Sequence, residues 1–491
     1  MQSFVTRHRP RLTLLLAFAT VWLWIFLAAI LNESQLGDSL EQFIWAQSFE
    51  WGYWKHPPLS TWLMYWAIHL IGPSHLWPYL LNAVLYTITL YCTFKIAELL
   101  FNADIASLSL LLLTLHYGFT RRAQLYNHNS VLVCFIALTV LVTLLALRDD
   151  KFGQWALAGL LAGLSLLVKY QAILPLVGIL VAIGLNNDFQ KRAKGIFVAI
   201  SVAFVTFSPH LYWVYETNFL PFSYGSNYLH HLDFEDRTER QLAFFFTQFR
   251  YYLPLIFFIL LLQVFSFAKL TKHHGSRIYF NRRQRAWLIG LLGTPLILIL
   301  FISFASGANL QGQWGMQSTQ FLVLLVAPWL FHKFGSFTRD HLIVWGGVQL
   351  VALFIFVLQG TGVFLYNTHR SAIRELPAKL FVKEAYTFWT SHTDCPLLYL
   401  SGSSALSSII SAYSDQKIFV LEDSDFRKTP WIDNTQLIHH GYLEVSSSQT
   451  AVIDKDTKSV PYNVVSHESA YADSNLFLVM KFHGPTLDCK H

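Results

Sequence analysis

One carboxylate in the sequence stands where acid–base chemistry could take place, in a polar segment between two long apolar stretches. Asp38 follows Gly37 in the run GDSLEQFIWAQ. Helical spacing places Glu41 or Gln42, and then Trp45, on the same face as Asp38. Such a carboxylate has two interpretations: a general base that removes a proton from a hydroxyl group, or a helix cap that accepts hydrogen bonds from free backbone amides.

Cations and hydrogen-bond donors interrupt the apolar sequence at several later points. Arg121, Arg122 and His128 lie in the run TRRAQLYNHNS, and the runs SPHLYW and GANLQGQWGMQ add further donors. Lys169 separates two apolar stretches, and a charge in so tight a turn is unfavourable unless it meets an anion or water. Snorkelling of the lysine to lipid headgroups is the alternative explanation. If these segments share one side of a membrane, their chemistry suits a phosphate-bearing lipid with a polar head.

The elements that position these groups must cross a lipid bilayer. Hydrophobic residues make up 54% of the chain and charged residues only 13%, whereas a soluble domain has about a quarter charged residues. One globular core cannot bury so much apolar surface, so lipid must cover much of it. The net charge of +6 reflects where the lysines and arginines lie along the chain and gives no indication of a nucleic-acid partner.

The apolar stretches predict about eleven transmembrane helices, at residues 12–31, 77–100, 104–119, 130–147, 154–168, 171–185, 195–213, 251–268, 286–305, 319–332 and 341–361. Arg7, Arg9 and Arg11 precede the first stretch, which indicates a cytoplasmic N-terminus and an uncleaved anchor. Most of the other lysines and arginines then fall in the inner segments, as the positive-inside rule requires. An odd number of spans places the C-terminus outside the cytoplasm.

The composition changes after Gly362. Short apolar runs at 396–400, 417–421 and 476–482 alternate with polar, helix-like stretches, a pattern typical of a small α/β domain. We therefore predict a membrane domain at residues 1–362, with a long first outer loop at 32–76, and an extracytoplasmic α/β domain at 363–491.

Two of the four cysteines bracket this tail. Cys395 enters its first apolar run and Cys489 lies two residues from the C-terminus. An oxidising compartment outside the cytoplasm lets disulfides persist, so we predict a bond between them; two unrelated thiols are the alternative. Cys92 and Cys134 fall in predicted spans, where a small buried hydrophobic residue is the default interpretation.

The first outer loop resembles that of a known family. The run from Asp38 through Trp45-Ala46-Gln47, Trp51-Gly52-Tyr53 and His56-Pro57-Pro58-Leu59 is similar to the first periplasmic loop of bacterial GT-C glycosyltransferases related to protein O-mannosyltransferases and the lipid A aminoarabinose transferase. Weaker likenesses cover nearly the whole chain, at Tyr126–Asn129, Lys169-Tyr170, Ser208-Pro209, Gly307–Trp314 and Arg427–Trp431. The resemblance implies an α-helical polytopic protein of the bacterial inner membrane, with its α/β domain in the periplasm.

The resemblance also implies a reaction and roles for particular residues. Such enzymes take a sugar from a polyprenyl phosphate, undecaprenyl phosphate in most bacteria, and transfer it with inversion to an extracytoplasmic acceptor. Asp38 matches the aspartate expected to act as general base. Cations must offset the charge of the leaving phosphate. The candidates for this donor-phosphate site are Lys169, Arg121 and Arg122, with Tyr170 and His128 as hydrogen-bond partners.

Further residues of these motifs are expected to contact the substrates, namely Glu41, Gln42, His56, Asn127 and Trp314. Relatives often have a glutamate directly after the catalytic aspartate, whereas Ser39 follows Asp38 here. This departure removes the second acid that could contact a divalent metal, so we assign no metal and leave the cofactor open.

Two other functions are compatible with parts of this sequence. A transporter or a flippase for lipid-linked sugars would also be polytopic, but transporters tend to have internal repeats with interrupted helices, and none is visible here. An undecaprenyl-linked polymerase or ligase of a different fold is the third possibility. The sequence leaves the sugar open, and lipid A, lipopolysaccharide core, another glycan and protein hydroxyls all remain candidate acceptors.

Overall fold

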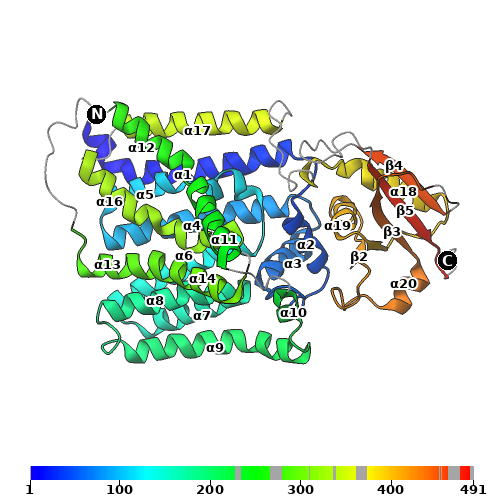
Figure 1. The fold of residues 1–491 in the computed structure, drawn as a ribbon, viewed down its shortest axis with the longest axis horizontal. Helices are drawn as coiled ribbons and strands as arrows, with labels where there is room; N and C mark the ends of the chain where they lie inside the picture. The colour runs from blue at the N-terminus through cyan, green and yellow to red at the C-terminus, as the bar shows by residue number, and fades with distance from the viewer. Residues whose placement is uncertain are drawn as a thin grey trace.

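Long apolar helices form most of the chain up to Gly360 (Figure 1). The computed structural model describes residues 2–226, 234–265, 279–308, 310–334, 339–360, 373–452, 454, 456–462 and 476–486. Within these ranges, six helices are long and apolar enough to cross a membrane. They are α1 (Gln2–Leu31), α4 (Trp77–Leu100), α6 (His128–Asp149), α9 (Ala193–Glu216), the continuous segment of α13 (Arg282–Leu288), η5 (Ile289–Gly293) and α14 (Thr294–Ser306), and α17 (Arg339–Gly360).

A seventh span is formed if one bent pair of helices crosses as a unit. Helices α11 (Phe234–Tyr251) and α12 (Leu253–Phe265) meet at an angle of 53°. Shorter apolar helices complete the bundle: α5 (Ala103–Leu113), α7 (Phe152–Val168), α8 (Ile173–Leu185) and α16 (Val323–Phe334). Each of the eleven predicted stretches is thus largely helical. A multi-pass membrane protein is confirmed, while the count of eleven spans stays a prediction.

The bundle packs closely inside and remains apolar outside. A Cβ atom on Gly159 would lie 2.3 Å from the carbonyl oxygen of Ala199, so α7 and α9 can approach this closely only because residue 159 is glycine. On the outer surface Phe197, Phe204 and Phe301 are more than half exposed. Large apolar side chains on helices of this length are expected to face lipid.

The tail forms a small mixed sheet covered by helices, as the sequence predicted. The strands follow the order β2-β1-β3-β5-β4; β1 pairs in parallel with β2 and β3, and β5 is antiparallel to both β3 and β4. Their bounds are β1 (Tyr399–Gly402), β2 (Phe419–Glu422), β3 (Tyr442–Ser448), β4 (Thr457–Tyr462) and β5 (Leu476–His483). The accompanying helices are α18 (Ala378–Thr390), α19 (Ser404–Tyr413) and α20 (Asn434–His440).

The first outer loop joins these two parts. It contains α2 (Gly37–Trp45) and α3 (Leu59–Ile71), which lie between the bundle and the sheet domain together with α10 (Leu220–Ser226) (Figure 1). Leu40, Ile44 and Trp45 of α2 belong to the hydrophobic core of the sheet domain. The loop therefore orients the tail relative to the membrane helices, a packing that the sequence did not reveal.

The cysteines follow the predicted pattern as far as the structure describes them. Cys92 and Cys134 are buried free thiols in the helices. Cys395 is disulfide-bonded. Its predicted partner, Cys489, lies outside the described residues, so that pairing stays a prediction.

Candidate active site

Asp38 is held in place by a neighbouring helix cap. It is the second residue of α2, whose N-cap is Leu36, and no side chain caps this helix. Instead, Oδ2 of Asp38 accepts a hydrogen bond of 2.8 Å from Nδ2 of Asn127. The Oδ1 atom of Asn127 caps α6 by accepting from the backbone N–H groups of Asn129 and Ser130. The amide of Asn127 is thereby fixed with its N–H toward Asp38. Because Asp38 accepts no hydrogen bond from the backbone at the start of α2, the helix-cap interpretation of Asp38 is wrong.

Ser39, at the position where relatives often have a second acid, has a docking role. Its hydroxyl donates to the carbonyl oxygen of Tyr126 and accepts from the N–H of the same residue, both at 3.1 Å. These bonds fasten α2 to the segment just before α6. The sequence departure at Ser39 therefore helps to position Asp38 beside Asn127.

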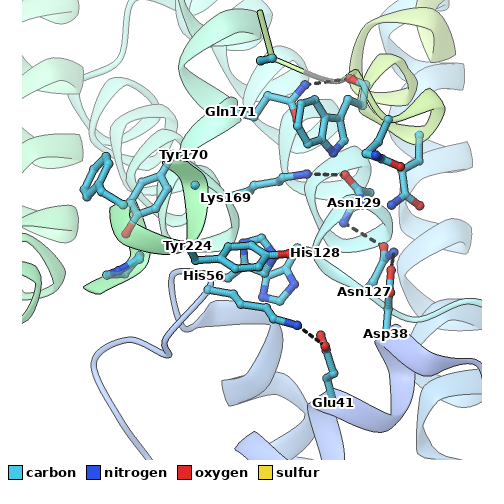
Figure 2. Close-up of a pocket in the computed structure, with 18 residues that line it drawn as sticks. Asp38, Glu41, His56, Asn127, His128, Asn129, Lys169, Tyr170, Gln171 and Tyr224 are labelled. Carbon is cyan, nitrogen blue, oxygen red and sulfur yellow. Dashed lines mark hydrogen bonds and ion pairs between the residues drawn. The ribbon is translucent and has the colours of Figure 1, made fainter. Parts of the chain in front are cut away.

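Two cavities meet at Asp38. The first, here called the lysine cavity, has a volume of about 360 Å³ (Figure 2). It is lined by Asp38, Glu41, Lys55, His56, Asn127, His128, Asn129, Lys169, Tyr170, Gln171, Pro221, Phe222, Tyr224, Gly225, Ala308, Gln311, Gln313 and Trp314. The second, here called the arginine cavity, has a volume of about 280 Å³. It is lined by Leu36, Gly37, Asp38, Tyr117, Arg121, Arg122, Gln124, Leu125, Ile373 and Arg374.

Lys169 is a desolvated cation in the lysine cavity. It follows the last residue of α7 and is 9% exposed. Its Nζ atom donates to Oδ1 of Asn129 at 2.8 Å and lies 5.0 Å from the ring centroid of Trp314. Burial lowers the pKa of Lys169 to about 7. Because these contacts are neutral, an anion entering the cavity would stabilise the charged form of the amine.

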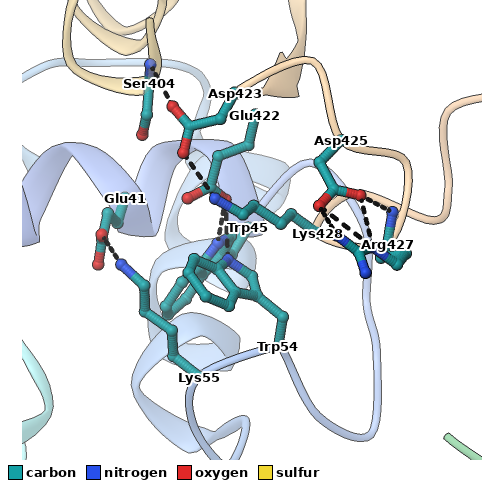
Figure 3. A network of polar contacts seen from close by, with 10 residues as sticks. All are labelled: Glu41, Trp45, Trp54, Lys55, Ser404, Glu422, Asp423, Asp425, Arg427 and Lys428. Atoms are coloured by element: carbon teal, nitrogen blue, oxygen red, sulfur yellow. Dashed lines mark hydrogen bonds and ion pairs between the residues drawn. The ribbon is translucent and has the colours of Figure 1, made fainter. Parts of the chain in front are cut away.

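A second lysine of this cavity is already paired. Lys55 forms an ion pair with Glu41 (Figure 3) and lies 4.5 Å from the ring centroid of Trp54. Burial raises the pKa of Glu41 to about 7 against the opposing pull of Lys55. Burial works against the charge of Lys55 as well, but the carboxylates of Glu41, Glu422 and Asp38 together hold the pKa of Lys55 above its usual value. This ion pair forms part of the cavity wall.

Neutral histidines form another part of the wall. The rings of His56 and His128 lie 4.1 Å apart. Burial, with the neighbouring His128, lowers the pKa of His56 well below its usual value. Among the described residues, neither Nε2 of His128 nor Oε1 of Gln171 has a hydrogen-bond partner, although both atoms are buried. Buried polar atoms are normally satisfied, so these two are candidates for contact with a bound polar ligand.

Tyr170 lines the lysine cavity but its hydroxyl group is engaged elsewhere. The hydroxyl lies 2.9 Å from Nε2 of His210, and Nδ1 of that histidine lies 2.6 Å from the carbonyl oxygen of Trp51. The ring stacks on Phe222 at 5.3 Å. Tyr170 thus connects the turn after Lys169 to the first loop and to α10.

The arginine cavity separates two of the predicted phosphate ligands from the others. Arg121 and Arg122 lie in η2 (Arg121–Gln124) and line this cavity, whereas Lys169, Tyr170 and His128 line the other. Arg122 donates to the hydroxyl of Tyr251 at 3.2 Å and to Oε1 of Gln313 at 2.7 Å. Since Gln313 lines the lysine cavity, the hydrogen bond between Arg122 and Gln313 connects the lining of one cavity to that of the other.

The predicted substrate contacts are mostly brought to the lysine cavity. Glu41, His56, Asn127 and Trp314 line it. Gln42 lines neither cavity: it is 1% exposed, and its Oε1 accepts a hydrogen bond of 2.9 Å from Thr61, so it fastens α2 to α3 instead.

Sequence reasoning assigned no individual role to several residues that line these cavities, namely Lys55, Tyr224, Gln311, Gln313 and Arg374. For Lys55 a signal existed, because it directly precedes His56-Pro57-Pro58 in the run that resembles the family. Arg374 follows the predicted membrane domain and carried no comparable signal.

Metal ligands do not gather in the described part of the chain. No group of three or more histidine, cysteine, aspartate or glutamate side chains there could hold a metal ion. The two carboxylates of the lysine cavity, Asp38 and Glu41, contact Asn127 and Lys55 respectively.

The sheet domain contacts the first outer loop through a buried glutamate. Glu422 of β2 is 1% exposed and accepts hydrogen bonds from the indole N–H groups of Trp45 at 2.9 Å and Trp54 at 3.2 Å (Figure 3). Burial raises the pKa of Glu422, while the bond from Trp45 opposes this rise. Lys428 lies 4.4 Å from the ring centroid of Trp54 and pairs with Asp423 at 2.7 Å. The tail motif Arg427–Trp431 thus begins beside the loop that carries Lys55.

The chain is similar to membrane glycosyltransferases in part of its sequence and in its fold. Residues 55–213 match a family described as dolichyl-phosphate-mannose-protein mannosyltransferase. The fold is similar to that in the crystal structure of ArnT from Cupriavidus metallidurans bound to undecaprenyl phosphate, with a TM-score of 0.60 and 14% identity over 95% of this chain and 97% of that one. The resemblance to GT-C glycosyltransferases, inferred from the motifs, is confirmed.

Two curated relatives are more specific. The chain is 22% identical over 297 residues to the lipid A galacturonosyltransferase RgtD of Rhizobium johnstonii, a match that covers 60% of each protein. It is 28% identical over 197 residues to the lipopolysaccharide core galacturonosyltransferase RgtA of the same organism, covering 39% of each. The matched part therefore spans less than two thirds of either relative.

Proposed function

We propose that this protein is an inverting glycosyltransferase that moves a sugar from a polyprenyl phosphate, undecaprenyl phosphate in bacteria, to a hydroxyl of a glycolipid or glycan. The reaction takes place at the outer face of the inner membrane, with the sheet domain in the periplasm. One observation carries the proposal: of the described residues, Asp38 alone lines both cavities. Inversion at a sugar carbon needs the nucleophile and the leaving group on opposite sides, and two cavities that meet at one carboxylate provide such an arrangement.

In this mechanism the donor phosphate occupies the lysine cavity and the acceptor hydroxyl enters from the arginine cavity. Asp38 removes the hydroxyl proton as the acceptor oxygen forms a bond to the anomeric carbon. The bond from that carbon to the phosphate oxygen breaks, and its electron pair stays on the phosphate. The hydrogen bond from Asn127 fixes the carboxylate for this step. The products are the glycosylated acceptor, polyprenyl phosphate and the proton held by Asp38.

Lys169 and Lys55 supply the positive charge that the leaving phosphate requires. Charge-assisted bonds to phosphate are about twice as strong as neutral ones, and they act with greater effect in a site that excludes water. Lys169 has no carboxylate partner among the described residues, so its charge is available to the donor. Lys55 can exchange its contact with Glu41 for one with phosphate, since the pKa of Glu41 is about 7 and its carboxylate can accept a proton.

The relatives support both substrate classes. The similar ArnT structure is described as bound to undecaprenyl phosphate, which favours this lipid as the donor's carrier. RgtD and RgtA are named for transfer to lipid A and to lipopolysaccharide core, which favours an outer glycolipid as the acceptor. The sugar itself stays open, although galacturonate is the first to try.

The test is an assay of the purified full-length protein with lipid-linked sugar in vesicles or detergent. A transferase releases polyprenyl phosphate only when an acceptor is present, and wild-type protein should do so. A flippase for lipid-linked sugars would move the donor across vesicles without release. Donor movement without any release, over a panel of glycolipid acceptors and sugars, would refute the proposal.

A further inference from the structure

The residues that line the arginine cavity carry more positive than negative charge. Arg121, Arg122 and Arg374 line it, and Asp38 is the one acid among the described residues that do so. The rest of the lining is neutral, with Leu36 and Leu125 among the apolar members. Three guanidinium groups around about 280 Å³ of space face a single carboxylate that the reaction already uses.

The contacts of these arginines neutralise only part of their charge. Arg122 donates to two neutral groups, the hydroxyl of Tyr251 and Oε1 of Gln313. Arg374 is 9% exposed, and its guanidinium group forms a long ion pair of 3.6 Å with Glu375, an acid that is not part of the cavity lining. Arg121 and Arg374 line the same cavity. Burial and the neighbouring Arg121 lower the pKa of Arg374, and Glu375 opposes this shift.

Such a cluster is unfavourable when it is empty. Charged groups withdrawn from water need paired counter-charges, and like charges beside one another add to the cost. A phosphate or carboxylate in the cavity would remove both penalties, because guanidinium groups bind these anions in a bidentate geometry.

The position of the cluster assigns this anion to the acceptor. The donor phosphate leaves on the far side of the anomeric carbon, toward Lys169, so it cannot also occupy the arginine cavity. The cluster is built from distant segments, η2 and η8 (Ile373–Glu375), the second of which leads into α18 of the sheet domain. We propose that the arginine cavity recognises an anionic group, phosphate or carboxylate, on the acceptor, so that the protein glycosylates charged glycolipids or glycans. This inference rests on the proposed function.

Direct binding to the purified full-length protein tests the inference apart from turnover. The probes are lipid A with and without its phosphates, and a core oligosaccharide with its carboxylates intact or reduced to alcohols. At least one charged probe should bind about tenfold or more tightly than its neutral counterpart, because each charge-assisted bond is substantial. A difference within the lipid A pair identifies phosphate as the ligand, and a difference within the oligosaccharide pair identifies carboxylate.

The variant Arg121→Gln separates the two cavities. It should weaken binding of the preferred charged probe at least about tenfold, while leaving the neutral probe and undecaprenyl phosphate unchanged. Arg427→Gln is the matched control, because Arg427 is an exposed arginine of the sheet domain, paired with Asp425, and this variant should bind all probes like the wild type. Arg374→Gln repeats the test from the second segment of the cavity.

Two results would overturn the inference. Equal affinity for charged and neutral probes would show that the cavity does not recognise an anionic group. Weaker binding of undecaprenyl phosphate by Arg121→Gln, with acceptor binding intact, would make the cavity part of the donor site. Failure of the proposed function would look different, since the assay would then show no sugar transfer whatever the acceptor binds.

Discussion

The affinity of the donor phosphate should fall as pH rises above neutrality, and Lys169 should be the cause. Burial lowers the pKa of this amine from 10.5 to about 7 in the empty cavity. A bound phosphate stabilises the charged form and returns the pKa toward its ordinary value. Binding above pH 7 therefore requires uptake of a proton, which makes the complex progressively harder to form.

The magnitude follows from the protonated fraction of the free amine. With a pKa of about 7, roughly 90% of Lys169 is protonated at pH 6 and about 3% at pH 8.5. The affinity for undecaprenyl phosphate should therefore fall about 30-fold over this range, which corresponds to about 2 kcal/mol of binding free energy. Donor binding should be stronger at low pH, because Lys169 of the free protein is already protonated there.

The assay is equilibrium binding of undecaprenyl phosphate to the purified protein between pH 6 and 8.5. Two variants separate the lysine from the phosphate, whose own second ionisation lies near pH 6. Lys169→Met should bind weakly with no pH slope beyond that of the ligand. Lys169→Arg keeps its charge throughout and should lose the slope while keeping much of the affinity. If wild type and Lys169→Met showed the same slope, Lys169 would not titrate against the donor.

Three further predictions follow from the same contacts. Asp38→Asn keeps the shape of the side chain but removes the base, so sugar transfer should drop at least about a hundredfold with an unchanged melting temperature; near-normal turnover would exclude Asp38 as the base. Glu422→Leu leaves the buried indole N–H group of Trp45 and the half-buried one of Trp54 without an acceptor, at about 1–3 kcal/mol for the buried group. Thermal unfolding should show this loss, and Glu422→Gln, which keeps an acceptor, should largely escape it. Thiol labelling of the unreduced, denatured chain should modify only the two cysteines of the helices, whereas labelling of Cys395 and Cys489 would disprove their bond.

Local sequence patterns alone determined much of this protein. Twenty or so consecutive apolar residues can be satisfied only as helices in lipid, so the long apolar helices could be predicted, and 77–100 matches α4 to the residue. Alternating short apolar runs likewise predicted the sheet of the tail. Asp38 was recognisable because it lies in a polar run at a helix start. These features depend on neighbours along the chain, which the sequence presents directly.

The tertiary structure decided which of the candidate groups act together. Arg121 and Lys169 looked equivalent as cations in outer turns, yet the fold places them in different cavities on either side of Asp38. Gln42 and Glu41 share a helix, but the side chain of Gln42 contacts Thr61, whereas Glu41 lines the lysine cavity.

Contacts between remote segments had no local signature. Arg374 joins η2 across more than 240 residues of chain, and Glu422 meets Trp45 at a separation of 377 residues. Periodicity reports only which face of an element is apolar. Which element covers that face depends on how helices and strands pack in three dimensions, and this packing determines where buried charges meet and what they can bind.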